Sequence, residues 1–88
     1  MSRIEVKQKD IETFEVTVRE AATTTHMVTV SQDYYQKLTG GRITPERFIE
    51  KSFEFLLERE SNTMILSRFD VSVIGDYFPE YEKTMVER

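Results

Sequence analysis

The sequence of 88 residues contains no cysteine. This absence excludes disulfide bonds, thiolate nucleophiles and cysteine-ligated zinc, so the fold must be held together by packing. No run of about 18 apolar residues occurs, so the sequence predicts no membrane-spanning helix. The N-terminal stretch MSRIEVKQKD is too polar for a signal peptide, and we therefore expect a cytoplasmic protein.

The chain also has no internal repeat, low-complexity tract or linker. Its length is enough for one domain, covering residues 1–88, and too short for two. Hydrophobic residues make up 39% of the chain and can fill one core. The termini, residues 1–10 and 83–88, carry many charges and are candidates for fraying, and for the final residues the extension of a helix is the alternative.

The formal net charge is −4, and the acidic excess lies in the C-terminal half. Residues 1–44 contain six basic and six acidic side chains, whereas residues 45–88 contain six basic and ten acidic ones. An acidic surface repels phosphate backbones, so the composition disfavours non-specific binding of nucleic acid, although it leaves room for a local basic patch.

The clearest local pattern predicts a helix over residues 44–60. Thr44 is a suitable N-cap, and Pro45 suits the first helical position. The apolar side chains and one serine occupy an arc of roughly 200°, about twice the width expected of a surface helix. We therefore expect this helix to be covered on two sides. The arc comprises Phe48, Ile49, Ser52, Phe53, Phe55, Leu56 and Leu57.

Alternating side chains predict strands before this helix. Residues 13–19 alternate polar and apolar side chains, as a half-buried strand does, and residues 25–31 repeat the pattern. The short connection favours an antiparallel hairpin, but pairing of residues 25–31 across a dimer stays open. Apolar residues at positions 4 and 6 alternate with charges and suggest a third strand at the sheet edge.

Shorter helices are predicted on both sides of residues 44–60. Residues 31–38 begin with a capping serine and end at a glycine pair, as a short helix does. Residues 71–78 follow a capping aspartate and end before Pro79, which favours a helix, while their β-branched residues leave a strand as the alternative. Residues 64–69 predict a compact apolar turn or a single helical turn.

Together these elements predict an α+β domain. It consists of an N-terminal antiparallel β-hairpin with room for a third strand, a short helix, a long central helix and a C-terminal helical segment, with the helices on one face of the sheet. A sheet this small covers the wide apolar arc of the central helix poorly. We therefore expect a homodimer to complete the core, and residues 69–78 folding back onto the helix are the other candidate cover.

His26 is the only histidine, and it is predicted to share a strand face with Val28 and Val30. A catalytic imidazole needs an orienting carboxylate and a nucleophile or substrate proton in reach. No cysteine and no Gly-x-Ser-x-Gly motif supplies one. We therefore expect a histidine at the edge of the core with one hydrogen-bonded nitrogen.

Three glutamates, Glu50, Glu54 and Glu58, follow one another at the four-residue spacing with which helices present carboxylates to metal pairs. The Glu-x-x-His that such sites need on a facing helix is absent, so we expect a solvated ridge paired with Arg47 and Lys51. The acidic C-terminal segment lacks the ordered series of oxygen ligands of a calcium loop. The sequence therefore predicts no catalytic residue, cofactor or metal site.

Aromatic residues are numerous for a chain of this length. Most of them are expected in the core, but aromatic side chains left partly exposed anchor protein interfaces. Tyr77 and Tyr81, near the C-terminus, are the candidates for such an interface.

The order strand, short helix, glycine turn and longer helix over residues 26–60, written HMVTVSQDYYQKL and then TGGRITPERFIEKSFEFLLERE, resembles a ribbon-helix-helix DNA-binding unit. The resemblance implies that two chains pair their strands into a ribbon in the major groove and that the second helix holds a phosphate at its N-terminus. The residues implied to read bases are Thr25, Met27 and Thr29, and those implied near the phosphate are Gly41, Arg42 and Thr44.

Over nearly the whole chain, the blocks FEVTV, YYQKLTGG, SFEFLLERE and SRFDVSVIGDYFPEYE resemble those of short bacterial proteins of unassigned function. We therefore expect a free-standing, non-enzymatic domain that acts through protein-protein contacts, with a second copy of itself or with another protein. A DNA-binding regulator or antitoxin of the ribbon-helix-helix type is the alternative.

Overall fold

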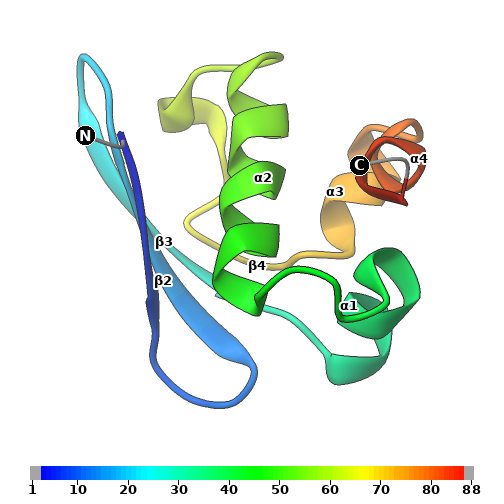
Figure 1. Ribbon diagram of the computed structural model, residues 1–88. Helices are drawn as coiled ribbons and strands as arrows, with labels where there is room; N and C mark the ends of the chain where they lie inside the picture. Colours follow the sequence, from blue (N-terminus) through cyan, green and yellow to red (C-terminus); the bar gives the residue numbers. More distant parts are fainter. Residues whose placement is uncertain (1–2, 87–88) are drawn as a thin grey trace.

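The computed structural model describes residues 3–86. These residues form one four-stranded sheet with helices on one of its faces (Figure 1). Strands β1 (Ile4–Gln8), β2 (Thr13–Arg19) and β3 (Thr23–Thr29) make an antiparallel meander. Strand β4 (Arg68–Asp70) pairs in parallel with β3, so β1 and β4 are the edges of the sheet. The α+β class is confirmed.

The predicted strands are found, including the third strand at the edge. Because residues 4–8 pair with β2, the expected fraying of residues 1–10 is wrong for this stretch. Residues 64–69 are more than a turn, since a single 3-10 turn, η1 (Asn62–Met64), leads into β4. A strand of three residues is too short to show the alternation that identifies strands in a sequence.

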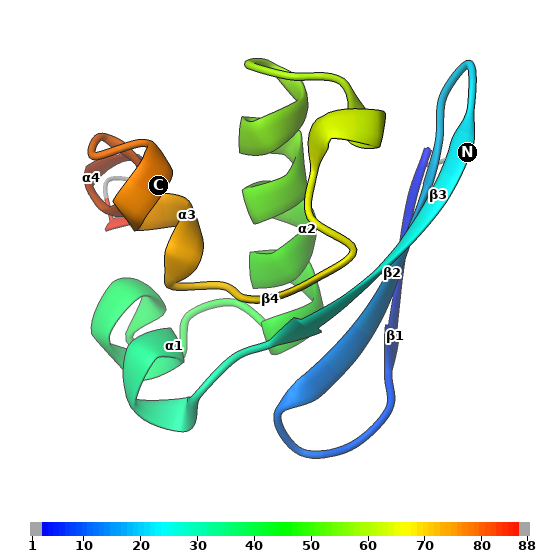
Figure 2. The ribbon, with the colours of Figure 1, turned by 180° about the vertical axis from the view of Figure 1, so that it is seen from behind.

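Alternation along the strands separates a covered face of the sheet from an open one. The covered face is apolar apart from Gln8, Thr24 and His26, and its side chains form rows across the strands because of the register. The open face carries charged residues and threonines and has no helix over it (Figures 1 and 2). One covered row consists of Phe14, Val28 and Phe69, and another of Val6, Val16 and His26.

Two helices follow β3 with the caps that the sequence predicts. Helix α1 (Gln32–Thr39) begins at Ser31, whose hydroxyl accepts the Tyr34 N–H, and it ends at Gly40 in the left-handed conformation with φ of 62°. Helix α2 (Pro45–Leu57) begins at a capping threonine and ends three residues before the predicted end of the helix.

Helix α2 lies between two layers. The sheet covers one side, and α1 together with the C-terminal helices covers the other (Figures 1 and 2). The Phe53 ring lies 5.4 Å from the His26 ring on the sheet side, and the Phe55 ring lies 5.2 Å from the Tyr81 ring on the opposite side. The wide apolar arc is therefore covered within one chain, and the reason for expecting a dimer to complete the core does not hold.

The C-terminal segment is helical. It forms α3 (Val73–Tyr77), which ends before Pro79, and α4 (Tyr81–Val86). Within the predicted range 71–78 a helix is therefore found rather than a strand, but the predicted cap is wrong, because Asp70 ends β4 and the N-cap is Ser72. Residues 83–86 are therefore helical rather than frayed, whereas residues 1–2 and 87–88 lie outside the described part of the chain. Within residues 3–86, no helix is long and apolar enough to cross a membrane.

Candidate functional site

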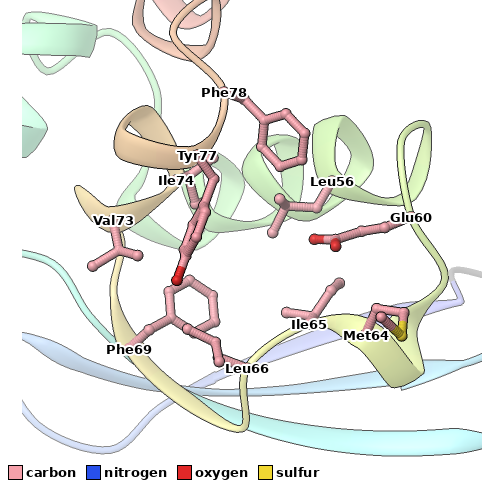
Figure 3. A pocket seen from close by; sticks show the side chains of 10 residues that line it. All are labelled: Leu56, Glu60, Met64, Ile65, Leu66, Phe69, Val73, Ile74, Tyr77 and Phe78. Carbon is pink, nitrogen blue, oxygen red and sulfur yellow. The ribbon is translucent and has the colours of Figure 1, made fainter.

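A groove of about 330 Å³ opens between the C-terminal end of α2, the segment from η1 to β4, and α3 (Figure 3). Its walls are apolar except for one carboxylate, that of Glu60, and one phenol, that of Tyr77. Tyr77 lies toward one end of the groove and Glu60 toward the other. The lining residues are Leu56, Glu60, Met64, Ile65, Leu66, Phe69, Val73, Ile74, Tyr77 and Phe78.

Exposed apolar side chains gather around this groove. Met64 is 70% exposed, Tyr77 67% and Leu66 48%. Only two other large hydrophobic side chains in residues 3–86 are comparably exposed, Ile11 and Val86, and neither lines the groove. A contiguous apolar patch of this kind, unlike a single exposed residue, marks an interaction site.

A chain of buried polar groups holds the wall formed by η1 and β4 against the sheet. The Asn62 amide donates to the Ala22 carbonyl and to the Thr24 hydroxyl, both at 2.9 Å. The Leu66 carbonyl can only accept, so His26 donates to it from Nδ1 at 2.8 Å, and Nε2 accepts from the Thr24 hydroxyl at 2.8 Å. Both ends of the segment between Asn62 and Leu66 are thus attached to the hairpin of β2 and β3.

This network also corrects the expectation for His26. The side chain is fully buried rather than at the edge of the core, and both ring nitrogens are hydrogen-bonded rather than one. Neither nitrogen faces the groove or a substrate. The geometry therefore makes His26 a structural residue.

The opposite wall, α3, is attached to the sheet through Asp70. The Asp70 carboxylate accepts from the Thr29 hydroxyl at 2.7 Å, and from the hydroxyl and N–H of Ser72 at 2.6 and 3.1 Å. Burial alone would raise the pKa of the Asp70 carboxyl, but these hydrogen bonds lower it below its usual value. An ionised Asp70 therefore holds Ser72, the residue before the first turn of α3, beside β3.

Glu60 contributes the one carboxylate of the groove. It follows the last turn of α2, where its N–H donates to the Leu56 carbonyl, and its carboxylate points into the groove toward Leu56 and Ile65 (Figure 3). The carboxylate makes no hydrogen bond or ion pair with any other residue among residues 3–86. Partial burial raises the pKa of Glu60 above its usual value, because the apolar wall of the groove removes part of the water that would stabilise the carboxylate.

The structure separates the two tyrosines that the sequence offers as interface residues. Tyr77 is on the surface and lines the groove. The expected exposure is wrong for Tyr81, because α4 turns its ring onto α2 and buries it completely. The Ser52 hydroxyl donates to the Phe48 carbonyl, so the Tyr81 hydroxyl donates to Ser52 Oγ, at 2.6 Å.

The residues that the ribbon-helix-helix resemblance implies as base readers lie on the open face of β3. Thr25 and Thr29 are exposed there, and Met27 is half-buried. Strand β3 pairs with β2 on one side and with β4 on the other. Over residues 27–29, both edges of β3 are therefore paired within the chain.

The residues implied near a phosphate lie in the turn between α1 and α2. Gly41 donates its N–H to the Thr39 hydroxyl, and Arg42 Nε donates to the Thr39 carbonyl at 2.9 Å. The Thr44 hydroxyl accepts the N–H of Arg47. These groups therefore end one helix and begin the next.

The glutamate ridge of α2 is paired with arginines at the surface. Arg47 Nη1 lies 2.7 Å from Glu50 and 3.6 Å from Glu54, and Glu58 lies 3.3 Å from Arg59. No group of three or more potential metal ligands occurs within residues 3–86.

No known protein family, curated protein or solved structure matches this chain. The assignment of a function therefore depends on the geometry of the groove.

The sequence pointed to one residue of the groove, Tyr77, and missed its other exposed members. Met64 and Leu66 flank a buried isoleucine in a short connection after a helix. A connection of that length can bury only part of such an apolar run. The run itself was therefore the sequence signal that some of its side chains would be exposed. The sequence offered no sign that Glu60 would face the same cavity.

Proposed function

We propose that this protein is a binding domain that acts through protein-protein contacts and that the groove beside Tyr77 is its contact surface. The observation that carries the proposal is the gathering of three exposed apolar side chains, Met64, Leu66 and Tyr77, around one apolar groove. Interfaces are enriched in methionine and tyrosine, and apolar anchors bound in pockets supply most of their energy.

Binding is favoured over catalysis by what surrounds the groove. Its lining contains one carboxylate and no histidine, lysine or serine that would pair with it as a nucleophile or a proton donor. A catalytic site of ordinary construction places at least two such groups within hydrogen-bond distance of each other. The partner is another protein or a second copy of this chain, and a homodimer formed through the groove is tested in the same experiment.

The test is selection from a library of random peptides displayed on phage, with the purified protein as bait. The wild-type protein should enrich a set of related sequences. The variant Met64→Ser/Tyr77→Ser should lose that enrichment by about tenfold or more, because truncation of interface anchors has effects of this size. Both side chains are about two-thirds exposed, so the variant should stay folded.

The matched control is Ile11→Ser/Val86→Ser, which removes two exposed apolar side chains outside the groove. It should enrich the same peptides as the wild type. Light scattering on the same samples tests self-association through the groove. Equal enrichment by the wild type and the groove variant, or none by either, contradicts the proposal.

A further inference from the structure

The position of Glu60 indicates which kind of protein segment would bind in the groove. This inference rests on the proposed function. Glu60 is the one ionisable acid in a lining that is otherwise apolar, and the lining contains no basic side chain. Carboxylates at the protein surface are ordinarily solvated or paired with a cation. Eight other acidic residues of the described chain form ion pairs and show the second arrangement, for example Glu80 with Arg59 at 3.1 Å.

Glu60 departs from this pattern. Its carboxylate has no hydrogen-bond or ion-pair partner among residues 3–86, and it points into the groove, toward Leu56 and Ile65 (Figure 3). Arg59, the neighbouring cation, is engaged elsewhere, since its guanidinium binds Glu80, Glu58 and the Phe55 carbonyl. A ligand that closed the groove would remove water from Glu60, and an unpaired buried carboxylate is strongly unfavourable. An occupant without a cation would therefore be rejected at this end of the groove.

We propose that the groove binds a segment of another protein in which a lysine or arginine stands among apolar side chains, and that the Glu60 carboxylate pairs with that cation. The apolar side chains of the segment would pack between Tyr77, Leu66 and Phe69, while the cation would reach the end of the groove near Ile65. The charge makes the site selective, because it penalises purely apolar and acidic segments. The surplus of negative charge in residues 45–88 acts in the same sense by attracting a basic partner.

The same arrangement has a consequence for stability. Because partial burial raises the pKa of Glu60, the ionised form is less favourable in the folded than in the unfolded chain. The contribution of this residue is therefore most favourable below the usual pKa of glutamate and is lost as the pH rises through the raised value. At neutral pH, Glu60→Gln should be as stable as the wild type or more stable, as is common when a charge is kept for binding.

The experiment repeats the phage selection with Glu60→Gln and Glu60→Lys as baits, with Glu46→Gln, at the other end of α2, as the matched control. Wild type and control should enrich peptides that carry lysine or arginine at a fixed distance from apolar residues. For one such peptide made synthetically, Glu60→Gln should weaken binding about tenfold, as expected for a hydrogen-bonded charge pair. A peptide with its cation replaced by glutamate should bind Glu60→Lys better than it binds the wild type, which a merely structural role of Glu60 would not produce.

Three outcomes overturn the inference while leaving the groove as the contact surface. The first is enrichment that depends on Met64 and Tyr77 but shows no basic residue. The second is a basic preference that persists in Glu60→Gln. The third is a dimer of the wild-type protein that is lost in Met64→Ser/Tyr77→Ser, since the occupant would then be a second copy. Loss of groove-dependent enrichment altogether is the failure of the proposed function instead.

Discussion

At the scale of single residues, the groove depends on buried polar side chains. Asn62 and His26 lie in the core and use their hydrogen-bonding groups to attach the segment that carries Met64 and Leu66 to the sheet. Buried polar groups stabilise a structure only while they are paired, because an unpaired one keeps the full cost of its lost hydration. The groove wall formed by η1 and β4 is therefore held in place by hydrogen bonds that lie outside the groove.

Asn62→Ala should lower the free energy of unfolding by about 1–3 kcal/mol, because it removes the hydrogen bonds that the buried Asn62 amide donates to the Ala22 carbonyl and to the Thr24 hydroxyl. Urea unfolding measures this change. The control is Ser67→Ala, an exposed position on the same segment, where we expect a change within about 0.5 kcal/mol. Similar losses for both variants would show that the network does not hold the segment.

The buried pair Tyr81 and Ser52 makes stability depend on pH in the alkaline range. Burial of the phenol raises the pKa of Tyr81. The unfolded tyrosine loses its proton near pH 10, whereas the folded one keeps it, so the unfolded state binds fewer protons there. The free energy of unfolding should therefore fall as the pH rises above about 10.

In Tyr81→Phe, this decline should become shallower by up to about 1.4 kcal/mol per pH unit, the contribution of one proton. Urea unfolding in steps from about pH 9 to pH 11 brackets the ordinary tyrosine pKa. Near neutral pH the two proteins should differ only by the lost hydrogen bond, about 1 kcal/mol. Parallel declines above pH 10 would mean that Tyr81 is not buried in its neutral form.

At the scale of helices and strands, local signals were sufficient where the chain determines its own conformation. Thr44 with Pro45 begins α2, and Gly40 ends α1 in the left-handed conformation that favours glycine. The alternation of β2 (Thr13–Arg19) defines that strand to the residue. For the two helices the capping interaction lies within a few positions along the chain, and for β2 the alternation that identifies the strand lies within the strand itself.

Elements fixed by distant contacts were not predicted. Strand β4 exists because residues 68–70 return to β3 after a long crossover through two helices, and three residues carry no usable periodicity of their own. The exposure of Met64 and Leu66 follows from the same return of the chain. Composition could locate an apolar segment there, but it could not say which side chains would remain uncovered.

Helix α2 provides the element-scale prediction. Phe53 is fully buried between the His26 and Phe69 rings, so Phe53→Ala should cost about 3–5 kcal/mol in the free energy of unfolding. The control is Glu54→Ala, at the adjacent exposed residue. It should change the free energy of unfolding by no more than about 0.5 kcal/mol. Chemical denaturation of both variants makes the comparison, and a small loss at Phe53 would contradict the packing of α2 on the sheet.

At the scale of the whole molecule, the chain builds three layers in the order sheet, α2 and the remaining helices (Figure 2). The sequence correctly required cover on two sides of α2 and left two candidates for the second side, residues 69–78 folding back and a second copy of the chain. Phe78 and Tyr81 supply that cover. The apolar groove that the folded chain leaves uncovered, with Glu60 at one end, is smaller than the uncovered side of α2 that the sequence implied.

The most direct test of the groove as the binding surface is a titration followed through methyl carbon and proton resonances, with a synthetic peptide of the enriched sequence added to the labelled protein. We predict that the methyl signals of Met64 and Leu66 shift in proportion to the bound fraction. Those of Ile11 and Val86, which are also exposed but lie outside the groove, should stay in place. Shifts confined to Ile11 or Val86, with Met64 and Leu66 unmoved, would contradict the account.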